Sequence, residues 1–297
     1  MAAGAAGLTS APSTAPWGGA LAAHLPDGRL HLQHGPIDLV IAVDASPDET
    51  TAVYRQAIAR FQDVLAILVS ELPLLRQPLG ATPPPLTGPV AKRMLAACWP
   101  HRGVYVTPMA AVAGAVADEI LAAMVAGRAV RRASVNNGGD IALHLAPGEH
   151  YRIGLAGVED ALLHGDAVLR AEAPWRGIAT SGWRGRSQSL GIADAVTVIA
   201  RDAASADAAA TLIANAVDVD HPDIERLPAR TVREDSDLGD LPVTVAVGPL
   251  PESAIEAALG SGLAVAERMR SDGLIGGAVL RLQGRSVATV LDAPVRP

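Results

Sequence analysis

The sequence predicts an α+β fold in which helices pack on a mostly antiparallel sheet. Helical and extended stretches are grouped along the chain rather than strictly alternating, which argues against a doubly wound fold. From Ala129 onward the chain carries short stretches with a period of two, as strands joined by turns have. Hydrophobic residues make up 49% of the chain but aromatic residues only 3%, so the core should consist mainly of closely packed Ala, Val, Leu and Ile.

The chain length of 297 residues is enough to bury one large core. We predict a single domain at residues 29–297, preceded by a loose, flexible arm at residues 1–28 that is rich in Ala and Gly. The arm contains no Lys or Arg, so it lacks the charged start of a secretory signal. Because Cys98 is the only cysteine, the chain cannot form an internal disulfide bond. We therefore expect a cytoplasmic protein.

Turn and cap residues mark the elements of the first half of the chain. Gly35 and Pro36 separate two apolar stretches, as in a hairpin. Ser46 stands before a Pro and two acidic residues, which is typical of a helix start. Pro108 and Gly127 frame a further apolar helix. The expected elements are strands at residues 29–33 and 37–44, a long helix from residue 46 to near residue 73, and helices at residues 90–97 and 108–126.

The second half is expected to begin as a sheet and to end with a helix between strands. Ser205 should cap a helix that ends at Val217. Residues 218–240 are polar and show no period, so we predict a loop that is a candidate lid or partner-contacting segment. The expected strands lie at residues 129–135, 141–145, 151–156, 167–172, 177–180, 195–200, 242–247, 276–282 and 286–291, and the last helix lies at residues 251–269.

The charge pattern excludes two classes of partner. The net charge is −7, the pI is near 5.6, and no basic run is longer than a pair, so the footprint of a nucleic-acid-binding protein is absent. The most apolar stretch, residues 108–126, carries Asp118 and Glu119 in its middle, which a membrane-spanning helix would hardly tolerate. We expect neither nucleic acid nor a membrane as partner, and we expect a homo-oligomer.

A glycine-rich turn is the first candidate binding site. Gly138 and Gly139 allow positive φ and remove side chains that would block a ligand, so backbone N–H groups can face a phosphate or a carbonyl. An ordinary hairpin turn explains the same residues, since Asn-Gly is a strong hairpin signal. The turn consists of Asn136, Asn137, Gly138, Gly139 and Asp140.

A second candidate site follows the strand predicted at residues 177–180. Small hydroxyl residues end that strand, Trp183 can stack on a ring, and the arginines after it can fork onto an anionic group. A solvated loop has the same composition, so both interpretations stay open. The candidate residues are Thr180, Ser181, Gly182, Arg184 and Arg186, with Asp194 further along the chain.

A carboxylate and a hydroxyl spaced four residues apart form the third candidate site. Asp207 and Thr211 share one face of a predicted helix, and oxygen ligands of this kind suit Mg²⁺. An Asp in a first turn is also a common partner of the helix dipole. Asp118 lies in an otherwise apolar helix and can face the same site, although an exposed acidic stripe is the commoner arrangement. The histidines show no His-x-x-x-His pair, so a zinc centre is not expected.

Five motifs, taken in order, resemble the ApbE-like superfamily, whose named members are FAD:protein FMN transferases, and more closely a short branch of it. The resemblance is strong over residues 107–217 and weak on either side. Its motifs lie at residues 109–114, 135–141, 179–182, 196–200 and 207–211.

The resemblance implies a T-fold-related α+β architecture that binds FAD beside Mg²⁺ and moves the FMN half onto a Thr or Ser of a partner protein. By motif, Asp207 and Thr211 match the metal-binding carboxylate and hydroxyl, and the backbone carbonyl of Val112 matches a third ligand. Asp118 matches an Asp that closes a family segment, and residues 136–140 match the family's glycine-rich turn.

The chain departs from this pattern in two places. Ala113 stands where the transferases carry Lys, and the interval of residues 183–195 lacks the family's His-x-Ile-Asp-Pro-x-Thr-Gly segment. The leading hypothesis is a Mg²⁺-assisted enzyme that acts on a flavin or another phosphate-bearing, nucleotide-like small molecule. The alternatives are a non-catalytic ligand-binding or scaffold protein in a cofactor pathway, and an enzyme for an unrelated small anionic substrate that uses Arg184, Arg186 and Asp194.

Overall fold

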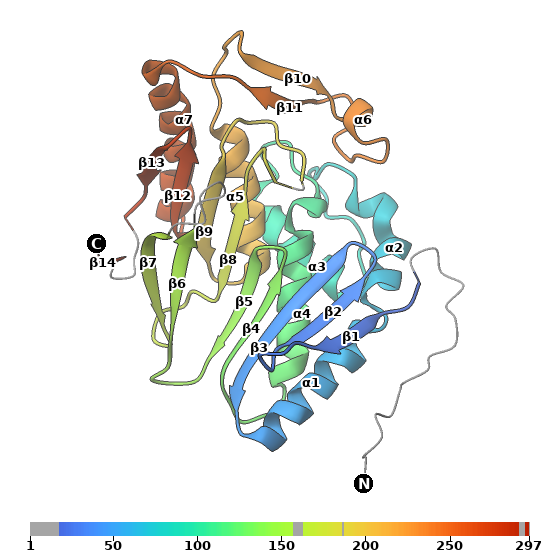
Figure 1. The fold of residues 1–297 in the computed structure, drawn as a ribbon. Helices are drawn as coiled ribbons and strands as arrows, with labels where there is room; N and C mark the ends of the chain where they lie inside the picture. Colours follow the sequence, from blue (N-terminus) through green and yellow to red (C-terminus); the bar gives the residue numbers. More distant parts are fainter. Residues whose placement is uncertain (1–17, 157–162, 186, 291–294, 297) are drawn as a thin grey trace.

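The computed structural model describes residues 18–156, 163–185, 187–290 and 295–296. Its main feature is a nine-stranded sheet in the order β1-β2-β3-β4-β5-β8-β9-β12-β13, in which neighbouring strands are antiparallel (Figure 1). The α+β prediction is therefore confirmed. The strands are β1 (Leu21–His24), β2 (Leu30–His34), β3 (Ile37–Ala45), β4 (Val130–Asn137), β5 (Asp140–Leu145), β8 (Gly177–Ser181), β9 (Ala195–Ala200), β12 (Ile275–Leu282) and β13 (Arg285–Ala288).

Helices cover one face of this sheet (Figure 1). The sheet offers them small, fully buried side chains such as Ala133, Ala142 and Ala179, so α4 and α5 can approach the strands closely. This agrees with the expected core of small aliphatic residues. The helices are α1 (Pro47–Phe61), α2 (Val64–Leu75), α3 (Pro89–Cys98), α4 (Val112–Val125), α5 (Ala203–Ala216), α6 (Ala229–Val232) and α7 (Glu252–Ser271), with 3₁₀ turns η1 (Trp99–His101) and η2 (Pro108–Ala111).

A small second sheet packs against the other face of the main sheet. Leu169 is fully buried there against Leu143, Ile178 and Ile199, which point away from the helices. Trp175 completes this cluster and lies directly against Gly276, where a side chain would overlap the indole ring. Both faces of the central strands are therefore buried. The small sheet consists of β6 (His150–Ala156), β7 (Leu163–Arg170) and β14 (Val295–Arg296).

The long helix expected from residue 46 to near residue 73 is two helices. Ser46 caps α1 as predicted, with its hydroxyl accepting the N–H of Glu49. The chain then breaks at Gln62 and Asp63 before α2, and Arg60 pairs with Asp63 across the break. Buried residues continue at helical spacing on both sides of the break, so the hydrophobic period alone could not reveal it.

Two strands lie where the sequence predicted irregular structure. β1 lies within the expected N-terminal arm and pairs with β2, while residues 1–17 lie outside the described residues. Within residues 218–240, β10 (Ile224–Pro228) and α6 replace part of the expected loop, and β10 pairs with β11 (Pro242–Val247). Every β1 side chain is exposed and β10 is mostly exposed, so neither strand carries the alternating burial that signals a strand.

The cap of α5 also differs from the prediction. Asp202, not Ser205, is the N-cap residue, and its side chain accepts the N–H of Ser205 at 2.7 Å. Because Asp and Ser are both favoured N-cap residues, the residue types alone could not show which of the two caps α5.

The stretch Pro108–Val125 is apolar and long enough to span a membrane by length and hydropathy. In the structure it forms η2 and α4, with Gly114, Ala117 and Ile120 buried in the core. Glu119, in its middle, pairs with Arg60 and Arg93 at 2.9 Å each. It is therefore a core helix of this fold, with its carboxylates bonded to the protein.

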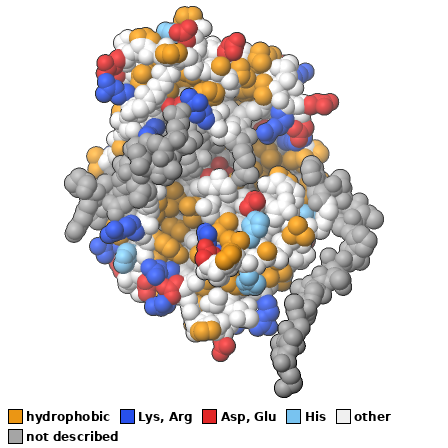
Figure 2. All heavy atoms as spheres, viewed as in Figure 1, with side chains coloured by type: hydrophobic (Ala, Val, Ile, Leu, Met, Phe, Trp, Pro, Cys, Tyr) orange, Lys and Arg blue, Asp and Glu red, His pale blue; other side chains and the backbone are white. Residues whose placement is uncertain are grey.

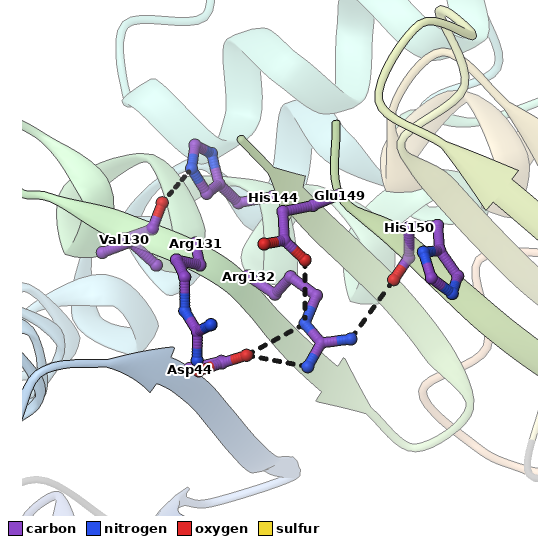
Figure 3. Close-up of polar contacts among 7 residues, drawn as sticks. All are labelled: Asp44, Val130, Arg131, Arg132, His144, Glu149 and His150. Atoms are coloured by element: carbon purple, nitrogen blue, oxygen red, sulfur yellow. Dashed lines mark hydrogen bonds and ion pairs between the residues drawn. The ribbon is translucent and has the colours of Figure 1, made fainter. Parts of the chain in front are cut away.

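A polar cluster holds the sheet together at the ends of β3 and β4 far from the glycine-rich turn (Figure 3). Arg132 donates to Asp44 at 2.7 Å and lies 3.7 Å from Glu149, and Arg131 also pairs with Asp44. These guanidiniums hold the pKa of Asp44 below its usual range.

On the face seen in Figure 2, Lys and Arg are interspersed with Asp and Glu among the described residues.

Candidate functional site

The candidate site begins at the contact between α4 and α5. Gly114, in the first turn of α4, lies against the backbone carbonyl of Ala203, and a Cβ there would overlap that carbonyl. This close approach lets the N–H of Gly114 donate to Asp207 on α5, at 3.0 Å. The small-residue composition of the two helices therefore places a carboxylate of α5 at the N-terminal end of α4.

Asp207 lies in an environment that disfavours its charge. Burial raises its pKa well above the usual range, and the neighbouring carboxylate of Asp140 raises it further, while the N–H groups of Gly114 and Ala113 act in the opposite direction. Two close carboxylates favour either a shared proton or a bound cation. Thr211 follows one turn later on the same face and lines the same cavities as both carboxylates.

The glycine-rich turn is both a hairpin turn and a wall of the site. Gly138 and Gly139 join β4 to β5 with φ of +65° and +116°, and Asn137 pairs with Asp140 across the turn. The side chain of Asn136 accepts the N–H of Gly139 at 2.8 Å. The hairpin interpretation is therefore confirmed, and the ligand-facing interpretation stays a prediction.

The polar side chains of this turn point toward the helices and the next strand. Asn137 is buried and donates to the carbonyl of Ala113 at 3.1 Å, which fixes the turn against the start of α4. Asp140 accepts the N–H of Thr180 at 3.3 Å. Asn137, Gly138 and Asp140 line a cavity, whereas Asn136 and Gly139 serve the turn itself.

Two cavities meet at these residues. The turn-side cavity, about 390 Å³, lies between the glycine-rich turn, the end of β8 and Arg184. The loop-side cavity, about 260 Å³, lies between η2, α5 and residues 233–238. Their shared wall is made of Ala113, Asp140, Ser187, Asp207 and Thr211. A ligand at the two carboxylates can therefore extend into both cavities.

The end of β8 forms the far wall of the turn-side cavity. The candidate residues Thr180, Ser181 and Gly182 line it, and the hydroxyl of Thr180 bonds that of Thr197 at 2.9 Å. A side chain at Gly182 would overlap the backbone of Asp194, so only Gly lets the chain pass there.

Arg184 and Asp194 lie together in this cavity wall. Arg184 donates from Nε to Asp194 at 3.0 Å and lies 4.6 Å over the ring of Trp183. The sequence analysis placed Asp194 further along the chain than the loop that carries Arg184, and the structure brings the two side chains together. Arg186 lies outside the described residues.

Asp118 does not line either cavity, contrary to the expectation that it faces the site. Its two carboxylate oxygens accept the N–H groups of Ala203 and Ala204 at 3.0 and 2.8 Å, so it caps the start of α5 from the neighbouring helix. Burial raises the pKa of Asp118 to about 7, with these two N–H groups opposing the shift. Its observed role is therefore to fix α5, which carries Asp207.

Several lining residues of the loop-side cavity went unnoticed in the sequence. Asp237 accepts the hydroxyl of Thr107 at 2.6 Å, and the hydroxyl of Tyr105 donates to its backbone carbonyl at 2.9 Å. Gln188 donates to the carbonyl of Ala229 at 2.9 Å. The polar, aperiodic sequence of residues 218–240 indicated a candidate lid or partner-contacting segment. That pattern did not identify Asp237 as a residue of the cavity wall.

The donor set at the shared wall fits a hard divalent cation. Among the described residues no three His, Cys, Asp or Glu side chains converge, so a cation here would rest on Asp140, Asp207 and the hydroxyl of Thr211 together with backbone or ligand oxygens. Val112, whose carbonyl was the predicted third ligand, lines the loop-side cavity. Oxygen-only sites with open positions are typical of Mg²⁺.

The fold and the site define an α+β protein with an oxygen-lined site where two helices, a glycine hairpin and two cavities meet. The family model described as AbpE bacteria matches residues 22–288, and the chain belongs to this family.

Sequence relatives are archaeal proteins described as UPF0280 protein. The one from Methanothrix thermoacetophila is 40% identical over 133 residues, which are 44% of this chain and 54% of the relative. The one from Methanosphaerula palustris is 34% identical over 192 residues, 64% of this chain and 77% of the relative. The chain spans about half the length of the first of these relatives.

Two solved structures are similar over most of their length. The apo flavinyl transferase ApbE of Pseudomonas stutzeri has a TM-score of 0.41 at 14% identity, covering 92% of this chain and 94% of that one. The flavin transferase ApbE of Vibrio cholerae has a TM-score of 0.43 at 14% identity, covering 92% and 98%.

Proposed function

We propose that this protein is a Mg²⁺-assisted enzyme that acts on a phosphate-bearing, nucleotide-like molecule, with FAD and FMN as the first candidates. The observation that carries the proposal is the position of Asp207 and Thr211. They lie one helical turn apart, beside Asp140, in the wall that two cavities share. Membership of the AbpE family and the ordered motifs at residues 109–211 support the flavin version.

In this proposal, each group of residues in the cavity wall would have its own role. Asp140, Asp207 and Thr211 would hold the cation, which when bound neutralises phosphate charge. The N–H of Gly114 orients the carboxylate of Asp207. Gly138 and Gly182 lack side chains in the cavity wall, so a phosphate can reach the backbone closely. In the flavin version of the proposal, a Thr or Ser hydroxyl of an acceptor protein would attack the phosphorus of the FMN half of FAD. A phosphoester bond to the acceptor would form as the pyrophosphate bond breaks, AMP would leave, and the hydroxyl proton would be released to solvent.

The test is calorimetric titration of the purified protein with Mg²⁺ and then with FAD or FMN. We expect Mg²⁺ binding that Asp207→Asn weakens at least 100-fold, and flavin nucleotide binding that depends on Mg²⁺. Asp240→Asn, at an exposed pair with Arg230, is the matched control and should behave as the unmodified protein. If neither FAD nor FMN binds below millimolar concentration, the flavin version is wrong.

A non-catalytic ligand-binding protein is the second candidate. Ala113 lies in the shared wall at the place where the transferases carry Lys, and its backbone carbonyl is bonded to Asn137. Mass spectrometry of the molecule that copurifies with the protein separates the candidates. An intact nucleotide recovered unchanged after incubation with Mg²⁺ and acceptor proteins favours binding alone, whereas a cleaved or transferred product favours the enzyme.

A further inference from the structure

A further cavity lies where the end of α4 meets α1, and we call it the α1 cavity. It has a volume of about 290 Å³ and is lined by Ala52, Arg55, Gln56, Ala59 and Arg128. The first four of these residues lie on successive turns of α1, and Arg128 follows the C-terminal end of α4. The two alanines leave the space open, and both charged residues of its wall are arginines.

Arg128 is held in this wall along one edge of its guanidinium. Gly127 has a φ of +68°, a left-handed conformation that turns the chain at the end of α4. The Nε of Arg128 then donates to the side-chain oxygen of Gln56. The amide nitrogen of Gln56 donates to the carbonyls of Ala123 and Ala126 at 2.7 and 3.2 Å. Gln56 therefore orients Arg128 and also covers carbonyls at the end of α4 that would repel an anion.

Both guanidiniums of the α1 cavity keep N–H donors for a ligand. Among the described residues, neither Nη1 and Nη2 of Arg128 nor the guanidinium of Arg55 has a bonding partner. Arg60, further along the same helix, shows the usual arrangement, because it pairs with Asp63 and with Glu119. No carboxylate of the described residues lines the α1 cavity. Two cations therefore share this cavity without a counter-charge in its wall.

This arrangement favours a small oxyanion. Two like charges beside one cavity repel each other, and an anion bound between them removes that repulsion. A guanidinium presents its donors as a planar fork that fits two oxygens of a phosphate group. The volume is at the lower end of ligand-binding cavities, which suits a phosphate with few further atoms. Since the net charge of the chain is −7, the attraction must come from this local pair of arginines.

We propose that the α1 cavity is a binding site for a small phosphate anion, which Arg55 and Arg128 bind together. The ligand is either free phosphate or the phosphate group of a small monoester. The site is separate from the candidate functional site, because α4 has 14 residues, a length of about 20 Å, and Asp207 contacts its other end at Gly114. The inference therefore does not rest on the proposed function.

The test is calorimetric titration of the full-length protein with inorganic phosphate in buffer without Mg²⁺. We expect binding that Arg55→Gln and Arg128→Gln each weaken at least about tenfold, because each change removes one fork of charge-assisted donors. Arg268→Gln, at an exposed arginine of α7 without an ion pair among the described residues, is the matched control and should bind as the unmodified protein does. Added NaCl should weaken the binding, because both arginines are exposed.

Ala59→Glu tests the charge of the cavity while both arginines remain. Ala59 is exposed and lies one turn after Arg55, so a Glu there keeps the helix and places a carboxylate where the phosphate would bind. We expect phosphate binding to fall at least about tenfold, with an unchanged free energy of unfolding in urea. Ala264→Glu, at an exposed position of α7, is the matched control and should bind phosphate normally.

Titration with methyl phosphate distinguishes the two sources of the anion. Binding as tight as that of inorganic phosphate, or tighter, assigns the site to a phosphate monoester, because the added group then fits the cavity. Weaker binding assigns the site to the free ion.

The outcomes also separate this inference from the proposed function. Asp207→Asn should bind phosphate as the unmodified protein does, so loss of the proposed Mg²⁺ site leaves the inference standing. If phosphate binds but neither Arg55→Gln nor Ala59→Glu weakens it, the anion binds elsewhere and the inference is overturned. Absence of phosphate binding to the unmodified protein also overturns it.

Discussion

A buried carboxylate and a partly buried one lie along the contact between α4 and α5, and their surroundings differ. Asp118, on α4, gives both oxygens to backbone N–H groups at the start of α5 and borders no described cavity. Asp207, on α5, receives an N–H of α4 but faces Asp140 and two cavities. One carboxylate completes the protein's own hydrogen bonds, whereas the other is left beside a second carboxylate.

This difference separates a structural acid from a candidate binding acid. Both have a raised pKa because of burial, so the pKa alone does not distinguish them. Their partners do, because backbone N–H groups stabilise a carboxylate permanently, while a neighbouring carboxylate destabilises it until a cation binds. Of the changes below, Gly114→Ala should disturb both ends of this contact, the changes at Asp118 and Asp207 should each act on one end, and Asp44→Asn is a comparison from outside it.

Gly114→Ala should have the largest effect, because it disturbs both ends of the contact. The added methyl would overlap the carbonyl of Ala203, and backbone on both sides leaves little freedom to move. We expect a loss of about 3 kcal/mol in the free energy of unfolding, measured by urea denaturation. Gly260→Ala, at an open position on α7, is the control and should be neutral or slightly stabilising. An unchanged stability in Gly114→Ala would mean that the two helices are not in tight contact.

Asp118→Ala should have the second largest effect on stability. It leaves the N–H groups of Ala203 and Ala204 buried without acceptors, at a cost of about 2 kcal/mol. The loss should appear in urea denaturation, and any weakening of Mg²⁺ binding should be smaller than in Asp207→Asn. Equal weakening by the two changes would place Asp118 in the site after all.

Most of the fold could be predicted from the sequence. The elements that were predicted wrongly have physical reasons for it. Strands with one or two buried faces, such as β5 and β9, carry an apolar pattern, whereas the exposed β1 and β10 carry none. The break before Asp63 keeps the apolar period and so leaves no signal.

The site was predictable only in part, because its residues come from segments far apart in the chain. Asp207, Thr211, the glycine-rich turn and residues 180–182 were each recognisable as motifs, and the structure places them in one cavity wall, with Asn136 and Gly139 of the turn outside it. Asp118 was also matched to the family by the resemblance, but the direction of its side chain depends on the packing of α4 on α5.

The pH dependence of stability should distinguish Asp118 from Asp44. The pKa of Asp118 is raised in the folded protein from 3.8 to about 7, so the folded state binds the proton more tightly, and this contribution to stability declines as pH rises from about 4 to 7. The pKa of Asp44 is lowered by Arg132 and Arg131, so its contribution is present above the usual carboxyl pKa and is lost as pH falls below it.

The measurement is urea denaturation of the unmodified protein, Asp118→Asn and Asp44→Asn between pH 3 and 8. The difference between unmodified protein and Asp118→Asn should shrink as pH rises, and the difference for Asp44→Asn should grow. Parallel curves for Asp118→Asn would show that Asp118 stays ionised throughout, held by its two N–H donors.

The smallest expected change in stability is that of Asp207→Asn in buffer without divalent cations, and its sign is the opposite of the others. The substitution replaces a carboxyl group whose charge is disfavoured beside Asp140 with a neutral amide, and it keeps an oxygen to accept the N–H of Gly114, so the protein should gain about 0.5 kcal/mol. Added Mg²⁺ should stabilise the unmodified protein, by about 2.7 kcal/mol at 100 times its dissociation constant, and leave Asp207→Asn unchanged. Thermal unfolding with and without Mg²⁺ measures both effects. A destabilised Asp207→Asn that no longer responds to Mg²⁺ would make Asp207 a structural residue like Asp118, because loss of the fold alone would then explain the loss of the cation.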